Sequence, residues 1–285
     1  MIERRPVATL LSHLVVVLGV LIVAFPVIVA LVAASQTSEQ IAQSVPMSLV
    51  PGDNFLASMS QALFGGKTIY GNTLPPVAPM LWVSLVSALV IAVGKIAISL
   101  LSAFAIVYFR FPFRGLIFWM IFITLMLPVE VRIVPTYAVV STLGMLDSYA
   151  GLTIPLIASA TATFLFRQFF LTVPDELVEA ARIDGAGPLK FFKDVLLPLS
   201  ATSIAALFVI QFIYGWNQYL WPLLVTTRED MYPIVMGIRR LIAGGDSATE
   251  WNVVMATALL AMVPPALVVI LMQRWFVKGL VDSEK

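Results

Sequence analysis

Residues 10–34 read LLSHLVVVLGVLIVAFPVIVALVAA, a run in which the single His13 is the one side chain that can carry a charge. A helix needs roughly 20 consecutive apolar residues to cross the hydrocarbon core of a bilayer. This run reaches that length and follows a basic pair, Arg4 and Arg5, with no clean small-residue cleavage pattern after it. We therefore predict a membrane-spanning helix rather than a cleaved signal peptide.

The composition of the whole chain has the same character. Of its 285 residues, 60% are hydrophobic and 12% are charged, whereas a soluble domain carries about 25% charged residues. Lipid is therefore the expected solvent for most of the surface. The net charge of the chain is +1, which argues against a nucleic acid partner. The chain has no cysteine, which excludes disulfides and thiolate metal sites.

Five further apolar runs meet or approach spanning length. We predict an all-α polytopic membrane protein whose six transmembrane helices form one domain over residues 1–285. The fifth run is longer than a straight span needs and is expected to bend near Gly215 or Pro222. The predicted spans cover approximately residues 10–34, 80–109, 116–137, 149–170, 199–225 and 251–273.

The basic residues predict the orientation, because they concentrate in cytoplasmic loops. With both termini in the cytoplasm, segments 35–79 and 228–250 become periplasmic. The Asn, Gly and Pro content of 35–79 predicts little regular structure there. The outside then holds Lys67, Arg228, Arg239 and Arg240, and the inside holds Arg4, Arg5, Arg110, Arg114, Arg167, Arg182, Lys190, Lys193, Arg274, Lys278 and Lys285.

The cytoplasmic segment 172–198 reads TVPDELVEAARIDGAGPLKFFKDVLLP and is predicted to form two short helices. Thr172 is expected to cap the first helix, and Gly185 to end it in the left-handed conformation that glycine adopts without strain. Pro188 suits the start of the second helix, which Pro198 is expected to end.

The chemistry of this segment favours a protein partner over the lipid surface. A helix that lies on anionic headgroups usually has a basic polar face, whereas the first helix here is acidic. The small pair Ala180 and Ala181 would let the backbone of another protein approach closely.

The same segment resembles the EAA loop of permease subunits in bacterial ATP-binding-cassette importers. Isoleucine is usual in that family at the position of Val195. Two further stretches, Ser102–Ala105 and Trp216–Pro222, resemble the carbohydrate-uptake branch of the family. The residues that carry the loop resemblance are Glu179, Ala180, Ala181, Gly185, Val195, Leu197 and Pro198.

The resemblance implies the type I importer permease fold in the bacterial inner membrane. It implies that the loop is a coupling helix seated on a cytoplasmic ATPase dimer, which binds ATP and magnesium, so that this chain holds no cofactor and no metal. The other implied partners are a homologous second permease subunit and a periplasmic substrate-binding protein. The implied ATPase-coupling residues are Glu179, Ala180, Ala181, Asp184, Gly185 and Pro198.

Charged residues inside predicted spans indicate a substrate path, because a charge in the bilayer is costly and usually faces a cavity or a partner. Lys95 and Arg132 are candidates to hold a phosphate group. Glu130, two residues before Arg132, is counted on the same path. Alternatively, Glu130 and Arg132 pair with each other or with a neighbouring helix, and Lys95 snorkels or pairs with the partner subunit. Trp216, Asn217 and Tyr219 are weaker candidates, since aromatic residues at helix interfaces more often pack than bind.

The substrate expectation follows from similarity within the family. Stretches Phe118–Arg132, Leu146–Phe170 and Gly279–Lys285 are similar to permeases that import sn-glycerol 3-phosphate. Glycerophosphodiesters or a neutral sugar remain alternatives. An ion-coupled secondary transporter would be expected to show internal repeats, and an enzyme would need a catalytic constellation that one histidine and scattered acids do not supply.

Overall fold

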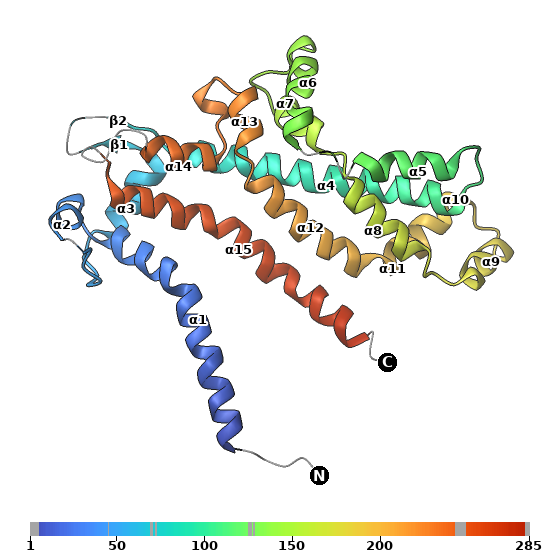
Figure 1. Cartoon of the computed structure of the whole chain (residues 1–285), viewed down its shortest axis with the longest axis horizontal. Coiled ribbons are helices and arrows are strands. Elements are labelled where there is room, and N and C mark those ends of the chain that lie inside the picture. The colour runs from blue at the N-terminus through green and yellow to red at the C-terminus, as the bar shows by residue number, and fades with distance from the viewer. Residues whose placement is uncertain are drawn as a thin grey trace. The chain divides into compact units, whose positions relative to one another are not determined.

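The computed structural model describes residues 6–44, 46–68, 71, 73–124, 127, 129–242 and 249–282. These residues are mostly helical and divide into two compact units, Met1–Ala78 with Gly237–Val263 and Pro79–Met236 with Pro264–Lys285. The elements, labelled in Figure 1, are α1 (Pro6–Ser35), α2 (Ser38–Gln43), α3 (Phe55–Phe64), β1 (Gly66–Lys67), β2 (Thr73–Leu74), α4 (Ala78–Tyr108), α5 (Arg114–Ile123), α6 (Val129–Thr142), α7 (Tyr149–Thr153), η2 (Ile154–Leu156), α8 (Ala160–Phe170), α9 (Asp175–Ile183), α10 (Pro188–Phe191), η3 (Phe192–Leu196), α11 (Leu197–Leu199), α12 (Ala201–Trp216), α13 (Leu220–Val225), η4 (Glu229–Met231), α14 (Ile234–Ile242) and α15 (Trp251–Asp282).

Three of these helices, within α1, α4 and α15, are long and apolar enough to cross a membrane, and the number rises to five if each of two bent pairs is one span. The pairs are 149–156 with 160–170, bent by 46°, and 188–199 with 201–216, bent by 73°. The predicted third span, 116–137, is divided between α5 and α6, and Pro128 lies outside the described residues. The count of six spans and the cytoplasmic termini stay predictions.

The first unit packs α3 and the start of α15 against the end of α1. Its core contains Ala34, Ala62, Val253 and Ala256. Asn252 ties the polar side together, because it accepts a hydrogen bond from the Ser38 hydroxyl at 2.6 Å and donates one to Ser58 at 3.0 Å.

The expectation of little regular structure in 35–79 was wrong. Segment 35–79 contains α2, α3 and the antiparallel pair β1–β2, in which Gly66 pairs with Leu74. Apolar residues of α3 and β2, such as Met59 and Leu74, pack against the core of the unit. This tertiary packing outweighs the weak local preference of a sequence rich in turn formers.

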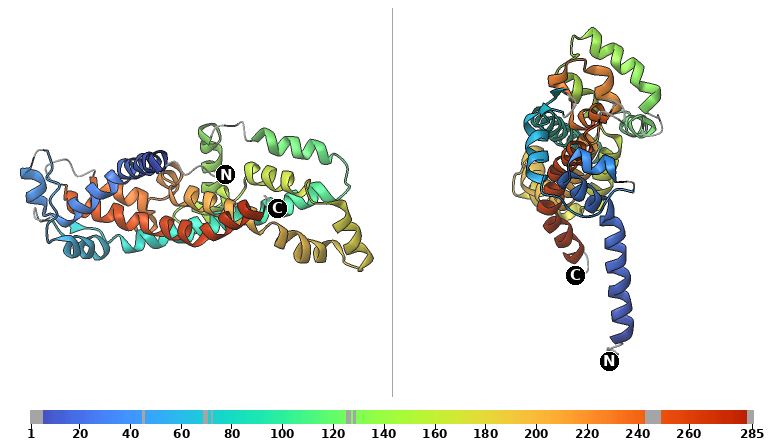
Figure 2. Two further views of the ribbon diagram at one scale, coloured as in Figure 1. Left: turned by 90° about the horizontal axis from the view of Figure 1, so that it is seen from below. Right: turned by 90° about the vertical axis from the view of Figure 1, so that its left-hand side faces the viewer.

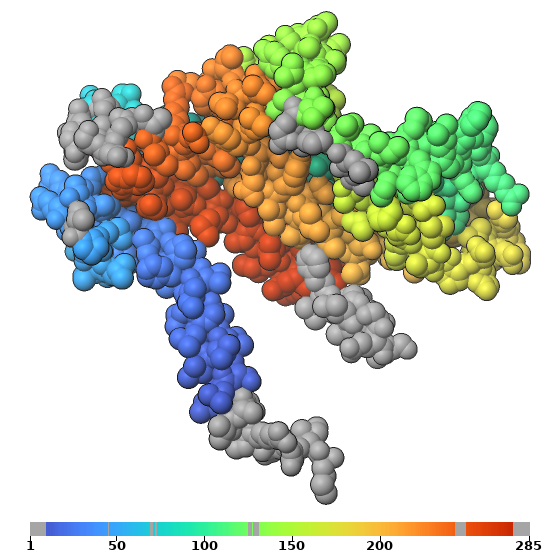
Figure 3. All heavy atoms as spheres, viewed as in Figure 1, coloured from blue at the N-terminus to red at the C-terminus, as the bar shows by residue number. Residues whose placement is uncertain are grey.

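The helix α1 packs against the rest of its unit only through its last turns. Only 11% of its most hydropathic part is buried, and Figures 2 and 3 show its amino-terminal part as a rod that stands clear of α2 and α3. Lipid tails solvate such a helix as well as leucine side chains do. Its exposure therefore fits a membrane-spanning segment.

The second unit is built along α4, which buries small side chains from Ser84 to Ala103. Small residues let membrane helices approach closely. The backbones of α4 and α12 approach closely, since a Cβ added to Gly215 would lie 2.9 Å from the Cα of Ala88. Farther along α4, Phe104 joins Phe166 and Phe170 of α8 in one buried cluster. This cluster forms the platform for the segment 172–198.

Candidate functional site

The segment 172–198 forms the two predicted short helices, α9 and α10, joined at Gly185. Gly185 has φ +71°, and its N–H donates to the carbonyl of Arg182 at 3.0 Å. Glycine is favoured in this left-handed conformation because it lacks a Cβ. The expected end of the first helix at Gly185 and the start of the second at Pro188 are therefore confirmed.

The expected cap at Thr172 was wrong. The residue that precedes α9 is Pro174, which has no capping side chain, and the Thr172 hydroxyl instead donates to the carbonyl of Phe169 at 2.7 Å. Thr172 belongs to the end of α8, because that helix closes with local hydrogen bonds before the chain turns.

One face of the segment packs on the unit's own core. Ala181 and Phe191 are buried, and the Phe191 ring lies 5.4 Å from the ring of Tyr108. The alanine pair is therefore split: Ala181 faces inward, and Ala180 alone is exposed. The expectation that both alanines form one outer surface was wrong, because neighbouring residues on a helix point about 100° apart.

The other face is exposed and mixes acids with apolar side chains. Glu179 and Asp184 are exposed there. Ile183 and Leu189 are 86% and 76% exposed, although both are large and apolar. We define Glu179, Ala180, Ile183, Asp184 and Leu189 as the outer face of the segment. Ile183 is a residue that the sequence interpretation missed, although an isoleucine between Arg182 and Asp184 on a polar helix was a usable signal.

The second helix does not end where expected. It changes to a π-helical turn over Phe192–Leu196 and then continues through Pro198 to Leu199. The chain then bends by 73° into α12. A π-turn is rare and frequently occurs at a functional site. It lies here at the join between the exposed segment and the predicted fifth span.

A separate cavity of about 470 Å³ lies within the second unit and has both predicted basic residues in its wall. Among its described lining residues, Lys95 and Arg132 are cationic and none is acidic. The uncharged polar residues of the wall include Thr136, Ser159 and Thr161. The volume suits a small molecule, and the wall has the charge and the donors that an anion would need.

Lys95 is buried, and only 6% of it is exposed. Its Nζ donates to Oε1 of Gln211 at 3.0 Å and lies 3.6 Å from the ring centre of Tyr214. An amide oxygen and an aromatic face both stabilise a cation without neutralising it. The positive charge of Lys95 therefore remains available to a ligand in the cavity.

The other candidates of the substrate path have different places. Glu130 belongs to α6, but its side chain lies outside the described residues, as does its expected pairing. Trp216 is buried and stacks on Phe212 at 5.8 Å, Asn217 is exposed, and neither they nor Tyr219 line the cavity. In the described part of the chain, no group of His, Asp and Glu gathers to hold a metal ion.

Gln211 and Tyr214 are the site residues that sequence reasoning missed. They stand three apart on α12, so they share a helix face, and both contact Lys95. A glutamine inside the apolar run 199–225 was the available signal, because a polar side chain within a span usually faces the protein interior or a cavity.

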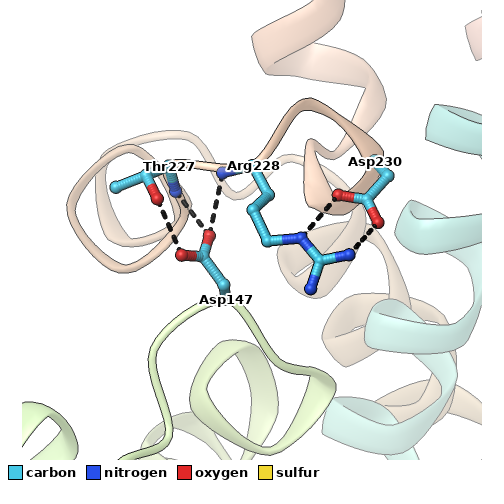
Figure 4. Close-up of polar contacts among 4 residues, drawn as sticks. All are labelled: Asp147, Thr227, Arg228 and Asp230. Atoms are coloured by element: carbon cyan, nitrogen blue, oxygen red, sulfur yellow. Dashed lines mark hydrogen bonds and ion pairs between the residues drawn. The ribbon is translucent and has the colours of Figure 1, made fainter.

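On the predicted periplasmic side, Asp147 forms a clamp between two loops of the same unit (Figure 4). Its carboxylate accepts hydrogen bonds from the backbone N–H of Thr227 at 2.6 Å and of Arg228 at 2.9 Å, and from the Thr227 hydroxyl at 2.7 Å. Arg228 forms a two-point ion pair with Asp230. The Asp147 clamp fixes the end of α13 against the turn that precedes α7.

Replacing Asp147 by asparagine is expected to lower the Tm of the purified protein by a few degrees. An amide has one acceptor oxygen and would turn its NH₂ group toward donors. Asp230→Asn is the matched control, because it removes only an exposed ion pair of little value. An equal loss of Tm in both variants would contradict the clamp.

The pH dependence of this variant provides a second readout. Hydrogen bonds from the backbone of Arg228 and from the side chain and backbone of Thr227 hold the pKa of Asp147 below its ordinary value of 3.8. The ionised carboxylate of Asp147 therefore stabilises the fold fully above pH 3.8, and this stabilisation is lost as the pH falls through the lower pKa of the folded state. The difference in Tm between the protein and Asp147→Asn should shrink only in that acidic range.

Comparison with known families matches residues 95–282 to the family described as "Binding-protein-dependent transport system inner membrane component". The chain is 63% identical over 286 residues to the sn-glycerol-3-phosphate transport system permease protein UgpE of Brucella melitensis, 62% to that of Agrobacterium fabrum, and 58% over 285 residues to that of Yersinia enterocolitica. In each case the similarity covers 100% of both chains.

A solved structure has the same fold. It is a bacterial ABC transporter involved in the import of the acidic polysaccharide alginate, and it superposes with a TM-score of 0.76 at 19% identity, over 97% of this chain and 99% of the other. At that identity the likeness concerns the fold. The fold is that of an ABC importer permease.

Proposed function

The chain belongs to the family of binding-protein-dependent transport system inner membrane components, and from this premise we propose that it is the permease subunit that carries sn-glycerol 3-phosphate across the bacterial inner membrane. The observation that supports this substrate is the full-length identity of 63% with a permease of that transport system. The cavity lined by Lys95 and Arg132 supports it independently, since a phosphate monoester needs cationic partners.

In this proposal Lys95 and Arg132 hold the phosphate while polar residues such as Ser159 and Thr161 meet the glycerol hydroxyls. The cavity combines a point charge and a guanidinium fork with no acidic lining residue among those described. A neutral sugar would gain nothing from two cations in the wall, although the burial of Lys95 costs free energy.

The energy for transport comes from a separate ATPase subunit in this proposal. The outer face of the segment 172–198 seats on that subunit, which binds ATP and magnesium, and the closure of an ATPase dimer moves the segment and α12 together. A homologous second permease subunit completes the path. A periplasmic binding protein delivers substrate to the side that carries segments 35–79 and 228–250.

The experiment that tests the proposal is uptake by the assembled complex in liposomes. Labelled glycerol 3-phosphate should enter only when ATP is present on the side of the segment 172–198. Excess unlabelled glycerol 3-phosphate should compete fully, glycerophosphocholine less, and maltose not at all. Competition by maltose would show a neutral-sugar permease, and uptake driven by an ion gradient without ATP would show a secondary transporter.

A further inference from the structure

A second cavity, of about 480 Å³, lies between α5 and α8 beside the end of α4. It is separate from the substrate path, since the two sets of lining residues have no member in common. Its described wall contains two arginines, one glutamine and no acid. The described lining residues are Ile106, Val107, Arg114, Gly115, Phe118, Trp119, Phe122, Phe164, Arg167, Gln168 and Leu171.

The wall combines fixed cations with an aromatic surface. The guanidinium carbon of Arg167 lies 4.1 Å from the ring centre of Phe118, and that ring stacks on Phe164 at 6.4 Å. Trp119 packs edge-on against Phe122 at 5.5 Å and is 58% exposed. The stacked arrangement holds Arg167 in place without neutralising its charge.

Arg167 has an unused donor. Its Nε is buried and has no hydrogen-bond partner among the described residues. A buried donor without a partner costs free energy, so a ligand that accepts from it would stabilise the protein. The other arginine, Arg114, donates a long hydrogen bond to the carbonyl of Phe109 at 3.4 Å, and among the described residues its other donors have no partner.

The proposed orientation places this cavity at the depth of the inner-leaflet headgroups, because α5 begins and α8 ends at the cytoplasmic side. Aromatic side chains gather at that depth, and basic pockets between membrane helices on that side bind acidic headgroups. We propose that the cavity binds the phosphodiester headgroup of an anionic phospholipid, such as phosphatidylglycerol, with Arg114 and Arg167 on the phosphate and the aromatic residues beside the acyl chains.

Trp119 provides a local readout of this site. The assembled complex is reconstituted into phosphatidylethanolamine bilayers that contain either brominated phosphatidylglycerol or brominated phosphatidylethanolamine, whose acyl chains quench tryptophan on contact. The difference in fluorescence between the protein and its Trp119→Phe variant isolates the signal of Trp119. We expect brominated phosphatidylglycerol to quench this signal at an about fivefold lower mole fraction than brominated phosphatidylethanolamine.

The arginine variants test which residues give the preference. Arg114→Gln with Arg167→Gln should bring the two lipids to equal quenching, whereas Arg274→Gln, an exposed arginine on α15, should leave the preference unchanged. A loss of fold in the double variant would not matter to the first comparison, which uses the intact arginines.

Three results would overturn the proposal. Equal quenching by both lipids would mean that the cavity contacts lipids without preference for an anionic headgroup. No quenching by either would mean that a partner subunit fills the cavity. Displacement of brominated phosphatidylglycerol by millimolar inorganic phosphate would mean a site for soluble phosphate. None of these results depends on which substrate the permease carries.

Discussion

Replacing Ile183 by aspartate is expected to abolish ATP-driven uptake while the chain still inserts and folds. Ile183 is 86% exposed, so its own chain loses little packing when it is changed. In the proposed docking, the aspartate would be buried against the ATPase, which adds a desolvation cost to the lost apolar contact. Central interface residues cost about 2–4 kcal/mol when truncated, which is a roughly 30- to 1,000-fold loss of affinity.

The measurement is the amount of ATPase that remains bound when the tagged permease is purified, together with uptake in vesicles. Leu143→Asp is the matched control, because Leu143 is 65% exposed and lies on the predicted opposite side of the membrane. Retention of the ATPase by Ile183→Asp at the level of Leu143→Asp would mean that the outer face of the segment 172–198 is not the docking surface.

Replacing Lys95 by methionine is expected to raise the KM for glycerol 3-phosphate by at least about 30-fold, because truncating one member of a buried charge pair costs 2 kcal/mol or more. Methionine fills a similar volume and leaves Gln211 without its donor. Folding should not suffer, since the variant removes a buried charge from a span. Arg132→Met is expected to act in the same direction.

Two controls separate binding from structure. Lys95→Arg keeps the charge and should keep most of the uptake. The amount of ATPase that copurifies should be unchanged in every variant, because the cavity and the outer face share no residue. If Lys95→Met and Arg132→Met both transport glycerol 3-phosphate with an unchanged KM, the assignment of the cavity is wrong.

The sequence predicted the helical elements well wherever apolar length alone decides them. Runs such as 10–34 and 80–109 became long helices, because a segment in lipid must satisfy its backbone internally. The turn at Gly185 was predictable for a similar reason, since its local conformation selects glycine. These features depend on the residues of one segment.

The rest depended on contacts between segments. Nothing local distinguishes Ala180 from Ala181, and only the platform of Phe104, Phe166 and Phe170 turns one of them inward. The hydrogen bond from Lys95 to Gln211 connects residues that are 116 positions apart in the sequence. The π-turn after Phe191 has no local signal that we can identify. The sequence therefore predicted Lys95, Arg132 and the turn at Gly185. The inward position of Ala181 and the contact between Lys95 and Gln211 could be found only from the packing of the helices.

The Asp147 clamp has a consequence for the timing of biosynthesis. Asp147 leaves the ribosome 80 residues before Thr227, its partner. At about 5–20 residues per second, the wait is roughly 4–16 s, and the intervening chain must first place α8, the segment 172–198 and α12. During that interval Asp147 lacks the backbone donors of Thr227 and Arg228, so the clamp closes late. The clamp at the periplasmic end is then expected to form after the cytoplasmic platform is complete and before Pro264–Lys285 joins the unit.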